Sequence, residues 1–157
     1  MISKKISKKE LTAKAKKIKA VALDADGVIF TGRVFVDEDR GEIFKERSKV
    51  DGGGFLILLA LGIKIVIISR EHNKFLDHVA NNFNKMSLVK SGQWPRVEVF
   101  GGRSGAGKVE ALKEWLEKHA IGWDDCAYMG DDVHDYAVMK KVGLAAAPAQ
   151  AEDVVKE

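Results

Sequence analysis

Two aspartates that stand two residues apart carry the strongest chemical signal in the sequence. Asp24 and Asp26 follow the apolar residues 20–23 and precede Gly27. Residues i and i+2 of a strand share a face, so strand geometry that continues to residue 26 would point both carboxylates the same way. Such a pair can bind a hard cation and divide the roles of nucleophile and acid/base. The alternative is an acidic turn after an edge strand, which Asp-Gly pairs commonly form.

A second acidic group follows a later apolar run. Residues 130–135 read Gly-Asp-Asp-Val-His-Asp and come directly after the expected strand over 126–129. Three carboxylates at a strand-to-helix junction suit Mg²⁺, which prefers oxygen ligands. Acids at a helix start are also favourable without a metal, through capping and the helix dipole. We expect His134 to lie at the rim of this group, because oxygen-rich magnesium sites rarely use imidazole.

Two more polar residues stand at junctions between expected elements. Ser69 ends the apolar run over 65–68, where its hydroxyl can donate to a phosphate oxygen or cap the next helix. Lys108 lies near the start of a helix expected over 107–119. A lysine there is unfavourable for the helix dipole, which indicates a nearby anion. The alternative is an exposed lysine with no role.

A glycine-rich segment before this helix resembles part of a nucleotide-binding loop. Residues 102–108 read Gly-Arg-Ser-Gly-Ala-Gly-Lys and match G-x-x-x-x-G-K after an expected strand. The next residue is Val109, so the hydroxyl that would hold Mg²⁺ is missing. Asp131 is the candidate for a Walker B acid, but its fit is unconvincing. The sequence therefore disfavours a nucleotide-hydrolysing enzyme.

The elements that position these residues alternate between strands and helices. We expect strands over 20–24, 63–68, 97–100 and 126–129, and helices over 52–61, 72–83, 107–119 and 133–141. Residues 33–37 and 42–47 flank a turn-like segment and predict a hairpin. The alternation predicts an α/β fold, a Rossmann-like three-layer sandwich whose mostly parallel sheet is covered on both faces. Such sheets bind ligands at the carboxyl ends of their strands.

The composition is that of one soluble domain. The chain has 157 residues, 46% hydrophobic and 31% charged, with a net charge of +3. Its apolar runs are too short to span a bilayer, and no apolar core follows the Lys-rich start, so we expect neither a membrane anchor nor a secretory signal. Cys126 is the single cysteine, which excludes an intramolecular disulfide and favours a cytoplasmic location. Its neighbours predict a buried strand residue.

The excess positive charge is concentrated in residues 1–19, which hold eight lysines and one acidic residue. This segment is either a basic helix for nucleic acid or membrane, or a solvated helix or tail that packs Ile2, Ile6, Leu11 and Ile18 on the domain. No aromatic residue interleaves with the lysines, which favours the second interpretation. We therefore expect no nucleic-acid or membrane partner, and divide the chain into a basic segment over 1–19 and a domain over 20–157.

The ordered set of Asp-x-Asp-Gly at 24–27, Ser69, Lys108 and Gly-Asp-Asp-x-x-Asp at 130–135 resembles the haloacid dehalogenase superfamily. Residues 24–33 are similar to the start of its capless sugar-acid phosphatases, and the resemblance covers about residues 12–153. This group includes 3-deoxy-D-manno-octulosonate 8-phosphate phosphatases, 2-keto-3-deoxynonulosonate 9-phosphate phosphatases and C-terminal modules of some acylneuraminate cytidylyltransferases.

The loop lengths agree with a capless enzyme. The stretch between Phe30 and Asp51 is long enough for a hairpin but not for a lid domain, and the connection from Ser69 to Lys108 is also too short for a large cap. The resemblance implies a homotetramer in which flap hairpins help to shape the pockets of neighbouring subunits. Apolar residues 34–36 in the expected hairpin fit such burial.

The resemblance also implies a mechanism, Mg²⁺-dependent hydrolysis of a phosphate monoester through an aspartyl-phosphate. Asp24 would be the nucleophile and Asp26 the acid/base. The Asp24 side chain, the Asp26 backbone carbonyl and Asp131 would hold the magnesium ion.

Further residues are assigned supporting roles by the same resemblance. Ser69 and Lys108 would bind the phosphoryl oxygens. Asp132 and Asp135 would orient the metal-bound waters and Lys108.

The residues after Ser69 bear on the substrate. Octulosonate phosphatases carry Gly-Arg at the positions that match Arg70 and Glu71. Nonulosonate phosphatases carry Glu at the position of Glu71. This favours a nonulosonate 9-phosphate over an octulosonate 8-phosphate as the substrate.

The resemblance also implies a glycine-rich segment and a final helix beyond Glu157, so the chain is either shortened or builds its substrate end differently.

Two other functions stay open. One is a non-catalytic tetramerisation module related to the cytidylyltransferase C-terminal domain, but the retained Asp26 and Lys108 favour an enzyme. The other is a monomeric phosphatase that acts on protein or nucleic acid through an open site.

Overall fold

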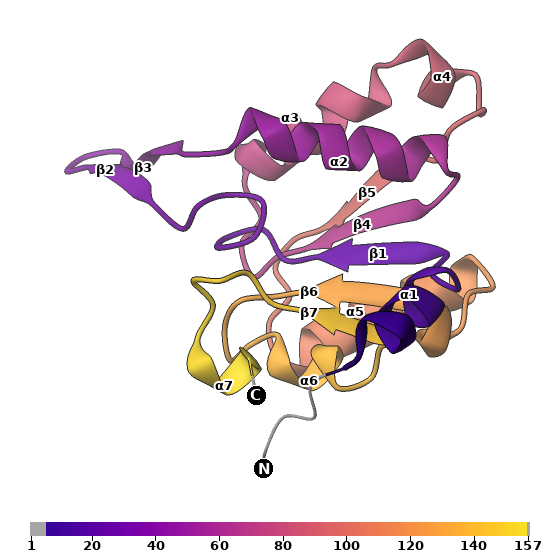
Figure 1. Ribbon diagram of the computed structural model, residues 1–157. Helices are drawn as coiled ribbons and strands as arrows, with labels where there is room; N and C mark the ends of the chain where they lie inside the picture. The colour runs from indigo at the N-terminus through magenta and orange to yellow at the C-terminus, as the bar shows by residue number, and fades with distance from the viewer. Residues whose placement is uncertain (1–5, 157) are drawn as a thin grey trace.

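Five parallel strands form the central sheet of the computed structural model, which describes residues 6–156 (Figure 1). Their order is β5-β4-β1-β6-β7, and all neighbouring strands pair in parallel. The strands are β1 (Ala20–Leu23), β4 (Lys64–Ile68), β5 (Val97–Phe100), β6 (Cys126–Met129) and β7 (Leu144–Ala146). Because all five run the same way, the loops that follow them meet at one edge of the sheet.

Helices cover both faces of this sheet (Figure 1). One face carries α2 (Lys49–Ala60), α3 (Lys74–Asn84) and α4 (Ser87–Lys90); the other carries α1 (Lys8–Ala15), α5 (Ala106–Lys118), α6 (Tyr136–Met139) and α7 (Asp153–Lys156). Alternate residues of β4 enter the two apolar cores, Ile65 and Ile67 on the α2 side and Val66 and Ile68 on the α5 side. This is the period-2 pattern of a strand buried on both faces, and the three-layer prediction is confirmed.

A separate antiparallel hairpin projects beyond the carboxyl edge of the sheet (Figure 1). It consists of β2 (Val34–Asp37) and β3 (Gly41–Lys45). Its apolar side chains face solvent, with Phe35 62% exposed and Phe44 63% exposed. The hairpin is the only insertion between β1 and α2, so no cap domain covers the site from this segment.

Several element boundaries differ from those predicted. Helix α2 begins at Lys49 instead of residue 52, because the Ser48 hydroxyl accepts the Val50 N–H and the three glycines lie inside the helix. The helix predicted over 133–141 is reduced to α6, since the residues before it form turns. Strand β7, helices α4 and α7, and the 3₁₀ turn over Trp123–Asp125 were not predicted.

The basic N-terminal segment contains a short helix that buries none of its residues. The Ser7 hydroxyl and the Glu10 carboxylate form a reciprocal capping box at the start of α1. Ile6 and Leu11 are exposed, so the expectation that they pack on the domain is wrong, while Ile18 is half-buried. The expectation for Ile2 lies outside the described residues.

Cys126 is fully buried in β6, as the sequence predicts. Burial raises the pKa of its thiol to about 12, which leaves it unsuited to act as a nucleophile. Within residues 6–156, none of the helices combines the length and the apolar character needed to span a membrane.

Gly143, just before β7, offers a test of the packing between this segment and the 3₁₀ turn over Trp123–Asp125. A Cβ there would lie 2.0 Å from the Asp124 carbonyl oxygen, a backbone atom that cannot rotate away. We expect Gly143→Ala to lower the free energy of unfolding by about 1–3 kcal/mol through overpacking. Gly122→Ala is the matched control, because no atom lies within 4 Å of the point that its Cβ would occupy. Chemical denaturation measures both, and equal stability of the two variants would contradict the packing argument.

Candidate active site

A buried lysine joins two buried carboxylates at the carboxyl edge of the sheet. The Lys108 ammonium donates to Asp24 Oδ1 at 2.7 Å and to Asp135 Oδ1 at 2.6 Å. Asp24 follows β1, Lys108 lies in the first turn of α5, and Asp135 immediately precedes α6. Tyr128 of β6 also donates to Asp135 Oδ1, at 2.6 Å. The anion that the position of Lys108 indicated is therefore supplied by the protein itself.

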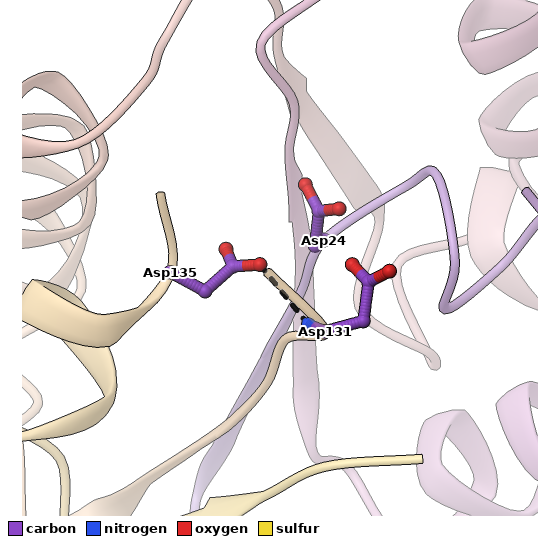
Figure 2. A group of neighbouring side chains, drawn as sticks. All are labelled: Asp24, Asp131 and Asp135. Carbon is purple, nitrogen blue, oxygen red and sulfur yellow. Dashed lines mark hydrogen bonds between the residues drawn. The ribbon is translucent and has the colours of Figure 1, made fainter. Parts of the chain in front are cut away.

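A third carboxylate, that of Asp131, completes an acidic group (Figure 2). One carboxylate oxygen each of Asp24, Asp131 and Asp135 lie within 4.8 Å of one another. The Asp131 backbone N–H donates to Asp135 Oδ2 at 3.1 Å, which ties the loop after β6 to the start of α6 (Figure 2). Gly27 makes room for this arrangement, because a Cβ there would lie 1.7 Å from Asp131 Oδ2.

Burial makes the carboxylates of Asp24 and Asp131 costly to ionise. It raises the pKa of Asp24 to about 7, although the neighbouring Lys108 ammonium acts in the opposite direction. It raises the pKa of Asp131 to about 6, and the negative charges of Asp132 and Asp135 add to the effect. Burial alone would lower the pKa of Lys108, but Asp24 and Asp135 outweigh it and raise that pKa.

The acidic group fits a hard divalent cation. Both oxygens of Asp135 already accept hydrogen bonds, from Lys108 and Tyr128 on one side and the Asp131 N–H on the other. The Asp131 carboxylate accepts none from another described residue, so Asp131 and the second oxygen of Asp24 have free ligand capacity. Desolvated carboxylates that their neighbours do not fully neutralise are the donors such a cation selects.

Asp26 lies beside this group but makes a different contact. Strand β1 ends at Leu23, so the premise that strand geometry carries Asp24 and Asp26 to one face is wrong. Both nevertheless line the same cavity of about 130 Å³. The Asp26 carboxylate accepts from Lys45 Nζ at 2.8 Å and does not belong to the three-carboxylate group. Its predicted role as a backbone-carbonyl ligand stays a prediction.

Ser69 and Arg70 line the same cavity. Ser69 is buried and its hydroxyl accepts the Glu71 N–H at 3.2 Å. It does not cap the next helix, because Asn73 is the N-cap of α3. Glu71 itself accepts from Lys45 at 2.8 Å, and this contact lowers its pKa.

Asp132 and Asp135, in the loop after β6, differ in whether they contact Lys108. Asp132 accepts the His134 N–H at 2.8 Å and makes no contact with Lys108 among the described residues, so its predicted role in orienting Lys108 is not seen. Asp135 makes that contact instead. His134 lines the cavity outside the carboxylate group, as a rim residue would.

Sequence reasoning missed two residues that hold the site together. Lys45 is one of 26 lysines and arginines, and nothing in its hairpin context marks it as buried. Tyr128 could have been found, because it follows the buried Cys126 at strand spacing and so faces the α5 side.

The comparisons with known proteins agree with this geometry. The sequence profile of a family described as haloacid dehalogenase-like hydrolase matches residues 56–157. The 3-deoxy-D-manno-octulosonate 8-phosphate phosphatase KdsC of Escherichia coli strain K12 is 32% identical over 146 residues, which cover 93% of this chain and 70% of the relative.

Solved structures give the same result. One is the 3-deoxy-D-manno-octulosonate 8-phosphate phosphatase from Moraxella catarrhalis in complex with a magnesium ion, a phosphate ion and a KDO molecule. It matches with a TM-score of 0.81 and 26% identity over 95% of this chain and 78% of that chain. The cobalt-bound deoxy-D-mannose-octulosonate 8-phosphate phosphatase from Haemophilus influenzae has a TM-score of 0.77 and 25% identity, covering 91% of this chain and 75% of that one.

The chain therefore belongs to the haloacid dehalogenase-like hydrolase family. It is a phosphoric monoester hydrolase of the capless sugar-acid phosphatase group.

Gly27 tests whether Asp131 belongs to a cation site. Gly27 and Gly32 have φ angles of +81° and +77°, so alanine at either position is strained by about 1–2 kcal/mol. Only the Gly27→Ala Cβ would collide with the Asp131 carboxylate, since the nearest atoms to a Gly32 Cβ lie at 3.8 Å. We expect Gly27→Ala to weaken Mg²⁺ binding about 10–100-fold relative to Gly32→Ala, measured by calorimetric titration. Equal affinities in the two variants would exclude Asp131 from the site.

Proposed function

We propose that this protein is a Mg²⁺-dependent phosphatase that hydrolyses a phosphorylated 2-keto-3-deoxy sugar acid through an aspartyl-phosphate intermediate. The observation that carries the proposal is the contact of 2.7 Å between Asp24 and Lys108 in a cavity that Asp26, Ser69 and Asp131 also line. This cavity joins a carboxylate nucleophile, a cation for the phosphoryl oxygens and a metal-ligating acid in one place.

Asp24 attacks the phosphorus atom in the first step. Lys108 fixes the carboxylate through Oδ1, and one of the two carboxylate oxygens forms the bond to phosphorus. The leaving sugar alkoxide departs and an acyl-phosphate remains on Asp24, so that one difficult displacement becomes two easier ones.

Asp26 transfers the protons. It donates to the departing sugar oxygen in the first step, and it removes a proton from the water that attacks the acyl-phosphate in the second. Its side chain is 38% exposed, so it can reach both a substrate and a water molecule.

Lys108 and Ser69 bind the phosphoryl group. The Lys108 ammonium is positioned to stabilise negative charge as it develops on the phosphoryl oxygens, and the buried Ser69 hydroxyl can donate to another of them. Asp135 holds Lys108 in place from the opposite side. Asp24 and Asp131 would hold the Mg²⁺ ion with the Asp26 backbone carbonyl, and the ion would offset repulsion between the nucleophile and the phosphate dianion.

The substrate proposal rests on two observations that favour different sugar acids. The named relatives are octulosonate 8-phosphate phosphatases, and the Moraxella structure holds KDO. Glu71 favours a nonulosonate 9-phosphate, but Lys45 and Asn73 already occupy one of its oxygens at 2.8 Å and 3.0 Å. Arg70 is exposed at the rim of the cavity, where it can contact the sugar.

We further propose a homotetramer that acts in the cytoplasm, with residues 20–157 as the catalytic domain and residues 1–19 as a basic appendage. The support for assembly is the exposed apolar hairpin, whose Phe35, Val36 and Phe44 are each more than half exposed. Burial of these side chains between subunits would remove a large apolar patch from water.

Asp24→Asn should abolish turnover, because an amide cannot form the acyl-phosphate. The amide keeps the size of the side chain, so fold and assembly should be retained. Phosphate release measures the activity, and circular dichroism with sizing chromatography checks the structure. Turnover above one-thousandth of the wild-type rate would exclude Asp24 as the nucleophile.

A substrate panel tests the reaction itself. Octulosonate 8-phosphate, nonulosonate 9-phosphates and simple phosphate esters are compared with Mg²⁺ and with EDTA. We expect a sugar acid phosphate to have the highest kcat/KM, and EDTA to abolish release. No phosphate release from any ester by a well-folded tetramer would support the non-catalytic assembly module instead. A fully active monomer would overturn the tetramer proposal.

A further inference from the structure

Lys45 is a buried cation on the projecting hairpin, and three carboxylates surround it. Its ammonium lies 2.8 Å from Asp26 Oδ1, 2.8 Å from Glu71 Oε2 and 3.2 Å from Glu42 Oε2. Its side chain is 1% exposed. The contacts to Asp26 and Glu71 are hydrogen bonds, and the contact to Glu42 is an ion pair. Burial acts to lower the pKa of Lys45, but the three carboxylates outweigh it and raise that pKa.

The contact with Asp26 is the part that concerns the reaction. Among residues 6–156, Lys45 is the residue whose side chain hydrogen-bonds the Asp26 carboxylate, and it takes only Oδ1. The second Asp26 oxygen accepts no hydrogen bond from a described residue, and Asp26 lines the cavity that it shares with Asp24. Asp26 stands in the loop after β1, where its backbone forms an isolated bridge with Phe30 but lies outside the strands of the sheet. Without Lys45 this carboxylate would be free to rotate away from the phosphoryl group.

Lys45 is itself held firmly, because it ends β3 at the base of the hairpin. The Thr31 N–H donates to the Glu46 carbonyl at 3.0 Å, and the Thr31 hydroxyl donates to the Glu46 carboxylate at 3.0 Å. These bonds fasten the base of the hairpin to the loop that contains Asp26. The backbone next to Lys45 is therefore tied to that loop.

We propose that Lys45 is a positioning residue that holds the Asp26 carboxylate in the orientation needed for proton transfer, and thereby couples the flap hairpin to catalysis. This inference rests on the proposed function, in which Asp26 serves the leaving group and the attacking water. A carboxylate that is misplaced by about 1 Å loses about 10²-fold in rate. Glu71 also accepts a hydrogen bond from Lys45 and so helps to hold the ammonium beside Asp26.

The first test compares leaving groups in the Lys45→Met variant. An alkyl phosphate needs a proton from Asp26 as its oxygen departs, whereas p-nitrophenyl phosphate releases a stable anion without one. We expect Lys45→Met to lower the single-turnover rate of alkyl phosphate cleavage about 10–100-fold and to change the first p-nitrophenol release less than about threefold. Slower hydrolysis of the acyl-phosphate should then give a burst of p-nitrophenol.

The second test is a double-mutant cycle that combines Lys45→Met with Asp26→Ala. It measures the steady-state rate of p-nitrophenol release, which includes hydrolysis of the acyl-phosphate, the step that needs Asp26. If Lys45 acts through Asp26, Lys45→Met should cost nothing further in the Asp26→Ala background. Lys45→Arg should retain more activity than Lys45→Met, because it keeps the cation. Lys49→Met is the matched control on an exposed lysine, and its rates should equal those of the wild type. Thermal unfolding and hydrogen exchange of the hairpin in metal-free protein verify that each variant folds.

The outcomes separate this inference from the function on which it rests. Equal losses for alkyl and aryl phosphates in a folded Lys45→Met variant, or equal losses in both backgrounds of the cycle, would show a general structural role and overturn the inference alone. Wild-type rates in Lys45→Met would also overturn the inference alone. Wild-type activity in Asp26→Ala would instead overturn the assignment of Asp26, and the inference with it.

Discussion

The buried ammonium of Lys108 between Asp24 and Asp135 is the interaction on which the rest of the site depends. Each partner comes from a different segment of the chain, and all three side chains are almost completely withdrawn from water. A buried ammonium with no carboxylate partner would be strongly destabilising, and here two carboxylates pair with it. The loop after β1, the first turn of α5 and the start of α6 must therefore meet in one arrangement, and the cavity is the space that this arrangement leaves.

Much of this arrangement could be predicted from the sequence, because a parallel sheet gathers the residues that follow its strands. Asp24, Ser69 and Asp131 each follow a strand that was expected from its apolar run, so the topology alone brings them to one edge. The helical position of Lys108 predicted an anion. The resemblance named Asp135 together with Asp132 as residues that orient Lys108. The local pattern alone could not single out Asp135, because turns over residues 133–135 replace the expected helix and the Asp135 carboxylate accepts from Tyr128.

The hairpin shows the opposite case, in which local sequence conceals the role of a residue. Lys45 ends a strand whose other side chains are mostly exposed, so its pattern is that of a surface lysine. What buries it is the approach of Asp26 and Glu71 from two other loops, which no local spacing encodes. The same strand carries the exposed Phe44 one residue earlier. The hairpin therefore presents apolar side chains to solvent and a cation to the site. In the proposed tetramer, a neighbouring subunit would contact the hairpin that holds Asp26 through Lys45.

The electrostatics of the cavity suit the metal cation and the phosphate of the proposed reaction. Burial raises the pKa of Asp24 and of Asp131, so the two carboxylates hold negative charge at a free-energy cost that Lys108 offsets only in part. A divalent cation would stabilise both carboxylates as anions, and its excess charge would then attract a phosphate dianion. On the proposed function, Asp24 would thereby be ionised when the phosphoryl group is beside it. The same burial excludes water from around Asp24, where Lys108 donates to the carboxylate.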